Sequence, residues 1–438
     1  MIKHSRLLQL WYINFGQGCL LESGKLLILT DNQRVAPVSL TVVSLISIFI
    51  FPTICTDIFI PAFFNIQEHY LIGETVVAIN SAYLLGLGIG SIIFGILLDL
   101  GKHSISLHIG SFFFIITGFF IYFFGLSFEK LLILRLIQGF FGSVCVISVP
   151  PLIVKFSSLE GGHRSISLLN AFASIALIAA PLISQFIIKI GVWSDILLFC
   201  SLGHFLLWIP LLLLHRKSFS PECAVSQKFS LSKYLFLVRS SDHTLLLAIT
   251  CLAYAAFVIF LAFLPFILNN VGTENLPLLQ SILMLSHFLG SISNFYLANK
   301  IGSASSFRFG RRFLLMGSLA IVAGLTLDQI MIIFLGLIAI YFSLAYVLSY
   351  LTSLRLQRFS AVSGASYSFG LIVRYLISAA LIQSISVVSS HHVGISAIII
   401  SLGLLSFCWI ASNFVLDAKA SWSSIKVQDH HQDLRYPH

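Results

Sequence analysis

Twelve apolar segments, nearly all long enough to cross a bilayer as a helix, constrain this chain more than any other feature. A spanning helix needs about 20 mostly apolar residues. Only 9% of the 438 residues are charged, which is too little charge to coat a soluble protein of this size, so these segments are expected to face lipid. We therefore predict an all-α integral membrane protein with spans at residues 36–64, 74–98, 105–125, 129–154, 165–188, 194–214, 243–268, 276–299, 312–327, 330–354, 362–386 and 392–416.

A hydrophilic stretch divides the spans six and six. We expect two pseudo-symmetric six-helix bundles with a leader, a linker and a tail, bounded as follows: leader 1–35, first bundle 36–214, linker 215–242, second bundle 243–416 and tail 417–438. The regions around the second and third spans and around the eighth and ninth spans are weakly similar, each with small residues, a short basic loop and a new helix. Repeated halves are typical of transporters that bind their substrate near the membrane midplane.

The basic residues predict the orientation of the chain. Cytoplasmic loops carry an excess of Lys and Arg. If both termini are cytoplasmic, the outer loops hold only Lys130 and Lys189 of the 25 Lys and Arg residues, and Arg135 and Arg374 lie within spans. All the others fall in the leader, the inner loops, the linker and the tail. We therefore expect a multi-pass protein of the inner (cytoplasmic) membrane with both termini in the cytoplasm.

Short motifs in both halves carry a resemblance to a known family. They are Thr56-Asp57-Ile58-Phe59-Ile60-Pro61, Gly95-Ile96-Leu97-Leu98-Asp99-Leu100-Gly101-Lys102, Arg135-Leu136-Ile137-Gln138-Gly139, Ala176-x-x-x-Ala180-Pro181-x-x-Ser184 and Gly310-Arg311-Arg312. On these motifs the chain resembles the major facilitator superfamily, and within it the twelve-helix drug:proton antiporter branch. It departs from the family pattern at Leu100, where a basic residue is usual, and in helix five, where Ala and Ser replace glycines.

The resemblance implies a fold and several functional residues. It implies a conformational loop motif made of Gly95, Asp99, Gly101, Lys102, Arg311 and Arg312. It implies an antiporter motif in helix five at Ala180 and Pro181. It also implies that the helix-one acid takes part in proton coupling. The glycine run Gly86-Leu87-Gly88-Ile89-Gly90 lies within an apolar helix with no preceding strand, so we interpret it as close helix packing and not as a nucleotide loop.

Three strongly ionisable side chains lie well within the spans: Asp57, Arg135 and Arg374. A charge at the bilayer centre costs roughly 2.5–3.5 kcal/mol on insertion scales, so such residues usually have a function. Asp57 and Arg135 lie about 10 Å and about 9 Å from the outer ends of helices one and four, a depth at which they could pair. We expect Asp57 to alternate between charged and neutral forms beside a permanently charged Arg135. In the alternative interpretation, the pair only holds helix one to helix four.

Arg374 lies about 18 Å along helix eleven, near the midplane, and no acid lies in any span of the second half. One hypothesis is that its planar guanidinium binds a carboxylate or phosphate of the substrate. The alternatives are that Arg374 binds backbone carbonyls or meets Asp57.

Aromatic and polar residues complete the predicted binding cavity. Mostly apolar walls with a few polar groups suit an amphipathic organic ligand. Besides Arg374, the candidate substrate-binding residues are Asn80, Tyr83, Gln138, Tyr254, Phe257, Tyr350 and Tyr367. His204 and His287 also lie in spans and could relay protons, although hydrogen-bonded helix packing is the simpler interpretation.

These features favour a secondary transporter. We expect proton-coupled export of a small amphipathic drug or metabolite, possibly an acidic one such as a siderophore. The alternative is proton-coupled import of an organic anion on the same fold, because architecture does not set direction. An enzyme is not expected, since HExxH and GxSxG are absent and only one acid lies well within the spans. An ion channel is disfavoured by the two-half pattern. We expect no cofactor beyond the proton gradient, no metal, no nucleic acid, and a monomer in the bilayer whose partners are its substrate and protons.

Overall fold

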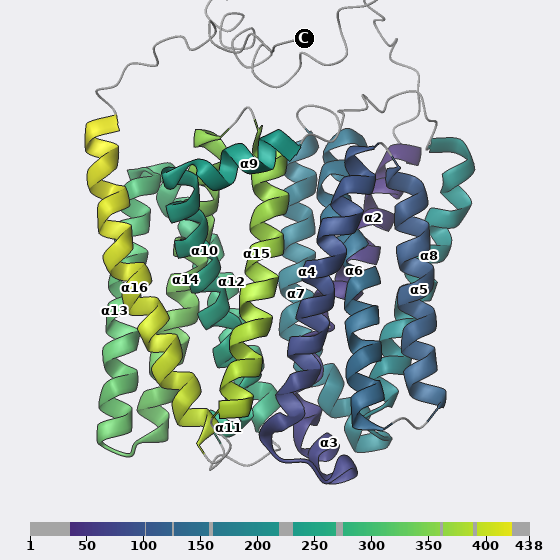
Figure 1. The fold of residues 1–438 in the computed structure, drawn as a ribbon, viewed down its shortest axis with the longest axis horizontal. Coiled ribbons are helices and arrows are strands. Elements are labelled where there is room, and N and C mark those ends of the chain that lie inside the picture. The colour runs from purple at the N-terminus through teal and green to yellow at the C-terminus, as the bar shows by residue number, and fades with distance from the viewer. Residues whose placement is uncertain are drawn as a thin grey trace, which may run out of the picture.

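The apolar segments form helices in the computed structural model (Figure 1). The structure describes residues 36–100, 102–124, 127–156, 161–218, 231–268, 275–359, 362–388 and 392–422. The elements of the first half are α2 (Ala36–Ile54), η1 (Ile60–Ala62), α3 (Phe63–Tyr70), η2 (Glu74–Val77), α4 (Ala78–Asp99), α5 (His103–Phe123), α6 (Phe128–Phe156), α7 (Gly161–Ile190) and α8 (Asp195–Ser218). Those of the second half are α9 (Leu231–Arg239), α10 (Ser241–Ala262), α11 (Leu264–Ile267), α12 (Leu276–Ile301), α13 (Ser303–Thr326), α14 (Ile330–Arg358), α15 (Ser363–Val388) and α16 (Val393–Trp422).

The long helices match the predicted spans closely. In the described part of the chain, 11 helices are long and apolar enough to cross a membrane, and a shorter apolar helix at Val43–Ile54 accompanies them. The two halves stand side by side in Figure 1, and α4 with α15 and α7 with α12 pack across the boundary between them. The expected all-α membrane fold is confirmed.

Basic residues gather at one end of the helix bundle, where Lys233, Arg239, Lys300 and Arg358 lie. We call the end that carries α9 and residues 300–303 and 355–359 the basic face, and the end that carries α3 and α11 the opposite face (Figure 1). At the basic face, α9 lies across the ends of the second-half helices in Figure 1. This helix falls in the predicted linker, where no helix was expected. Tyr234 of α9 packs edge-on against Phe369 of α15.

Helices one and seven are broken, where we predicted continuous spans at 36–64 and 243–268. The first break follows Ile54, and the chain resumes as η1 with Pro61 near its start. The second lies at Phe263, and α11 then begins with Pro265 near its start. Pro61 and Pro265 lie in the first turn of the new helices, where the missing N–H of proline leaves no hydrogen bond unmade. The broken segments η1 and α11 contact each other across the two halves.

Other helix ends lie several residues from the predicted ones. Helix nine begins at Ser303 and not at 312, because the short polar stretch before it continues the helix. Helix six continues to Ser218 into the predicted linker, and α16 continues to Trp422 into the predicted tail. The predicted leader lies outside the described residues.

Glycines bring helices α4 and α6 into close contact. A Cβ at Gly86 would lie 2.0 Å from the carbonyl oxygen of Leu136, and a Cβ at Gly139 would lie 2.2 Å from that of Tyr83. Gly88 faces Leu376 of α15, where an added Cβ would lie 2.7 Å from the side chain. Small residues let membrane helices approach this closely, so the packing interpretation of the glycine run is confirmed.

Candidate functional site

Asp57 lies in the break of helix one, and its side chain is 7% exposed. The N–H of Asp57 donates to the carbonyl of Ile54 at 3.0 Å. Its own carbonyl accepts from the N–H of Ile60 at 3.3 Å and from Nε2 of Gln280 at 3.0 Å. Unwound backbone at membrane depth needs such partners, because no water is there to replace them. The carboxyl is therefore carried by a segment that is bonded to the second half of the protein.

Arg135 is completely buried, and its guanidinium contacts groups other than the Asp57 carboxylate. Its guanidinium donates to the carbonyl of Cys55 at 2.8 Å and to Oε1 of Gln138 at 2.6 Å. It also lies over the rings of Phe59 and Tyr83, at 4.5 and 4.4 Å from their centroids.

The predicted pairing of Asp57 with Arg135 is wrong in this structure. Among the described residues, the one ion pair within 4.0 Å joins Arg358 to Asp242 on the basic face. Equal depth in the membrane did not bring the two side chains together, because the unwound turn presents the Cys55 carbonyl to Arg135 in place of the Asp57 carboxylate. Arg135 thus fixes the break that positions Asp57.

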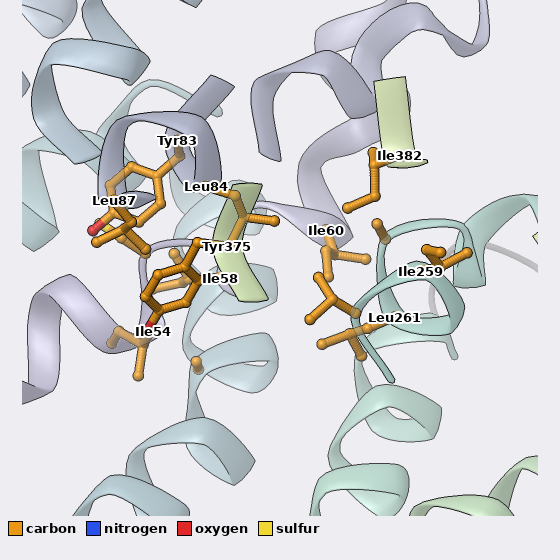
Figure 2. Packing of buried hydrophobic residues seen from close by; sticks show 14 of the residues in the cluster. Ile54, Ile58, Ile60, Tyr83, Leu84, Leu87, Ile259, Leu261, Tyr375 and Ile382 are labelled. Carbon is orange, nitrogen blue, oxygen red and sulfur yellow. The ribbon is translucent and has the colours of Figure 1, made fainter. Parts of the chain in front are cut away.

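Contacts between the two halves gather toward the opposite face. Ser81 of α4 donates to Gln383 of α15 at 2.8 Å, and Ser281 of α12 donates to the carbonyl of Ile178 in α7 at 2.8 Å. Figure 2 shows Ile60 of η1 beside Ile259 and Leu261 of α10, all members of one buried cluster. The halves are therefore joined tightly around the break that carries Asp57.

Arg374 is partly exposed and lies among tyrosines. Its guanidinium is 4.2 Å from the ring centroid of Tyr254 and 4.8 Å from that of Tyr375, and Nη2 donates to the Tyr375 hydroxyl at 3.1 Å. Neither alternative partner, a backbone carbonyl or Asp57, contacts the guanidinium in the described part of the chain. Tyr375 itself lies beside Ile58 and Leu84 of the first half (Figure 2).

The comparisons with known proteins agree with this architecture. The Major Facilitator Superfamily profile matches residues 42–355. The chain belongs to the major facilitator superfamily. No curated protein sequence matches it.

Solved structures of superfamily proteins are similar over nearly their whole length. The xylose transporter XylE from E. coli, in a partially occluded inward-open conformation, has a TM-score of 0.66 at 12% identity and covers 89% of this chain and 98% of its own. A D-xylose-proton symporter has a TM-score of 0.65 at 13% identity, covering 85% and 96%. A bacterial homolog of the human lysosomal transporter Spinster, inward-facing and unoccupied, has a TM-score of 0.63 at 14% identity, covering 89% and 98%. At these identities the likeness shows the fold.

Membership of the major facilitator superfamily makes this protein a secondary transporter and not an enzyme. In the described residues, no cluster of His, Cys, Asp or Glu could hold a metal ion. The matched region ends at residue 355, so Arg374 and all of α15 lie beyond it, although the similar structures extend over most of the chain.

The superfamily loop motif is only partly described. Lys102 is exposed at the start of α5, whereas Gly101 and the side chain of Asp99 lie outside the described residues. A Cβ at Gly95 would meet nothing within 4 Å. Arg311 and Arg312 lie in α13 and not in a loop. Arg312 is exposed, whereas the buried Arg311 donates to the Trp409 carbonyl at 2.9 Å and to Asn413 Oδ1 at 2.7 Å, which ties α13 to α16.

The remaining candidate residues divide between the tyrosine-lined region and the packed interior. Phe257 stacks on Tyr254 with 6.0 Å between ring centroids, so it lies beside Arg374, whereas Tyr350 stacks on Phe307 of α13 at 4.4 Å. Tyr367 is exposed on α15. Asn80 is buried, and its side-chain amide has no hydrogen-bond partner within the described chain.

Tyr83, Ala180 and Pro181 belong to the packed interior. Tyr83 donates to the Pro52 carbonyl at 2.7 Å. Ala180 and Pro181 are buried in α7, the helix that packs against η1 and α12.

The two membrane histidines differ. His287 contacts the Tyr341 carbonyl at 3.2 Å, as a helix-packing role requires. His204 is buried between Phe51 and Phe114, and neither ring nitrogen has a hydrogen-bond partner among the residues described. The expectation of a hydrogen-bonded role is therefore confirmed for His287 and wrong for His204, because aromatic rings surround its imidazole.

Two residues of the site were missed from the sequence. Gln280 follows the start of α12 by one turn, and a lone glutamine in an apolar helix gave no signal of a bond to the other half. Arg355 was assigned to an inner loop because it precedes Arg358 at the end of a span. In the structure it lies in α14 and is 3% exposed.

Proposed function

We propose that this superfamily member is a proton-coupled transporter that exports a small amphipathic organic compound, with Asp57 as the group that carries the proton. The observation that carries the proposal is the position of Asp57. It is a buried carboxyl on an unwound segment whose backbone is bonded to both halves of the protein. When one half moves against the other, the surroundings of the Asp57 carboxyl change.

The coupling follows from the charges around the break. Arg135 stays charged throughout the cycle, and its bonds to Cys55 and Gln138 keep the unwound turn in place. Protonation of Asp57 from the opposite face, which we assign to the outside, neutralises its carboxyl group. Loss of that proton to the cytoplasm restores the negative charge of Asp57. The two forms differ by a full buried charge, so they favour different arrangements of the two halves.

The substrate would lie near the tyrosines of the second half. Tyr254 and Phe257 offer aromatic faces, and Arg374, a partly exposed residue, offers a planar charged guanidinium. Asn80 adds a buried amide without a partner in the described chain. Apolar walls with a few polar groups suit an amphipathic compound.

We place the protein in the inner membrane as a monomer with cytoplasmic termini, and we propose that the loop motif at Gly95–Lys102 governs the change of conformation.

A second candidate function is import of an organic anion. Arg374 favours it, because the residue is only partly buried and no carboxylate lies within 4.0 Å of its guanidinium in the described residues. Proton and anion would then move in the same direction, since the proton compensates the negative charge.

Transport in everted vesicles tests both functions. A panel of labelled amphipathic compounds and organic anions is offered to vesicles with an acidic or an alkaline lumen. Export predicts saturable uptake that needs an acidic lumen, whereas import predicts accumulation only with the opposite gradient. The variant Asp57→Asn is expected to lose uphill movement and to keep downhill exchange. Uphill, gradient-driven transport by Asp57→Asn would refute the coupling role, and Glu129→Gln, the same carboxyl-to-amide change at an exposed residue, serves as the control.

A further inference from the structure

A buried arginine, Arg355, lies close to the partly exposed Arg374. Arg355 of α14 reaches the surface of α15 at Gly370, where a Cβ would lie 2.2 Å from its Nη2. Gly370 and Arg374 are four residues apart on one helix, so they share a face and are separated by about 6 Å along the axis. Cys251 of α10, which contacts the Gly370 carbonyl, lies one turn from Tyr254, which lies under Arg374. Both guanidinium groups therefore line the seam between α10 and α15.

Among the described residues, no carboxylate lies within 4.0 Å of either guanidinium. The sequence between residues 243 and 416 holds two acids, Glu274 and Asp328, and Asp328 follows the end of α13 at the opposite face. Asp242 is bonded to Arg358. Nε and Nη1 of Arg355 and Nε of Arg374 are buried without hydrogen-bond partners among the described residues. Buried charges are normally paired, because an unpaired one is strongly destabilising.

We propose that Arg355 and Arg374 form one site for a substrate that carries two negative charges, a short dicarboxylate or a phosphate monoester. This inference rests on the proposed transport function and narrows its substrate class. One anionic group meets Arg374 beside Tyr254, and the other meets Arg355 over Gly370. Glycine at position 370 is required, because a side chain there would occupy the space of the Arg355 guanidinium. Guanidinium groups bind carboxylates and phosphates through planar, charge-assisted hydrogen bonds.

Thermal unfolding of the purified full-length protein in detergent tests the site. The probes are succinate and phenyl phosphate, each compared with a partner of lower charge, monomethyl succinate and methyl phenyl phosphate, and with neutral dimethyl succinate. At least one dianion is expected to raise the unfolding midpoint and to bind roughly tenfold or more tightly than its singly charged partner, the effect of one charge-assisted hydrogen bond. The succinate and phosphate arms distinguish the two ligand chemistries.

Substitutions of the two arginines test which anionic group of the ligand each of them binds. Arg355→Met is expected to bind dianion and monoanion equally, and Arg374→Met to bind neither. Gly370→Ala should behave like Arg355→Met, whereas Gly364→Ala, on the same helix with nothing within 4 Å of its Cβ, should behave like the unmodified protein. Arg355→Met is also expected to unfold at the same or a higher temperature without ligand, since it removes an unpaired buried charge. A purely structural arginine would lower that midpoint.

Three outcomes would overturn the inference: no dianion raises the midpoint, dianion and monoanion bind the unmodified protein equally, or Arg355→Met keeps the preference for the dianion. Asp57→Asn is expected to bind the dianion normally. If that variant still drives uphill transport while dianion binding follows the two arginines, the proton-coupling proposal fails and the dianion site stands.

Discussion

Gln280 of α12 donates a hydrogen bond to the main-chain carbonyl of Asp57, 3.0 Å away and 223 residues distant in sequence. The bond joins the second half of the transporter to the break in helix one, and Gln280 is completely buried. A movement that opens the opposite face between η1 and α12 has to break this bond and leave a buried carbonyl without a partner. An unsatisfied buried acceptor costs about 1–3 kcal/mol, so the bond holds this face closed.

Replacement of Gln280 by leucine is expected to weaken that closure. With the bond gone in both conformations, the closed arrangement loses about 1–3 kcal/mol relative to the open one. The measurement is cross-linking between cysteines introduced at Ser81 and Gln383, which are hydrogen-bonded across the two halves. The yield should fall in Gln280→Leu. Gln357→Leu, an exposed change on α14, should leave it unchanged, and equal yields in both variants would contradict the role of Gln280.

Arg135→Met is expected to destabilise the first half. The change removes bonds to the Cys55 carbonyl and to Gln138, and hydrogen bonds to charged groups are worth about 1.5–3 kcal/mol. It also removes contacts with the Phe59 and Tyr83 rings. Thermal unfolding in detergent should show a lower midpoint. The exposed Arg312→Met provides the control, and a midpoint equal to that control would show that Arg135 does not stabilise the break.

Gly86→Ala is expected to force α4 away from α6. The added methyl would lie 2.0 Å from the Leu136 carbonyl oxygen, which belongs to the backbone and cannot rotate away. Overpacking of this kind costs about 1–3 kcal/mol. Gly95→Ala, on the same helix with open space around it, should leave the unfolding midpoint unchanged or raise it slightly, because alanine favours helix. Equal midpoints for the two variants would argue against close packing at Gly86.

Leucine substitutions at the two membrane histidines are expected to act in opposite directions. His204→Leu removes an imidazole whose nitrogens lack hydrogen-bond partners in the described chain. It should increase the free energy of unfolding by about 1 kcal/mol and so raise the unfolding midpoint. His287→Leu removes the contact with the Tyr341 carbonyl and should lower it. Proton-driven transport by His204→Leu should persist. Its loss, in a variant that is folded and stable, would instead indicate a proton relay at His204.

The sequence was sufficient for features that depend on local composition. Apolar segments of about 20 residues have to become helices in lipid, because every backbone polar group must be bonded within the segment. The apolar spanning helices and the close packing at Gly86 followed from that rule and from the size of glycine. The prolines at 61 and 265 were visible too, but an apolar run with a proline in it was interpreted as one span.

Only the tertiary structure decided which groups meet. The depth of Asp57 and Arg135 was predictable from the helical rise, yet their pairing failed, because the unwound turn presents the Cys55 carbonyl to Arg135. Arg355 looked like one more cytoplasmic charge, since charge bias is counted along the chain and says nothing about the direction of a side chain. Its burial at Gly370, and the bond from Gln280 to Asp57, depend on helices that are distant in sequence and pack at a rotation that no local pattern encodes.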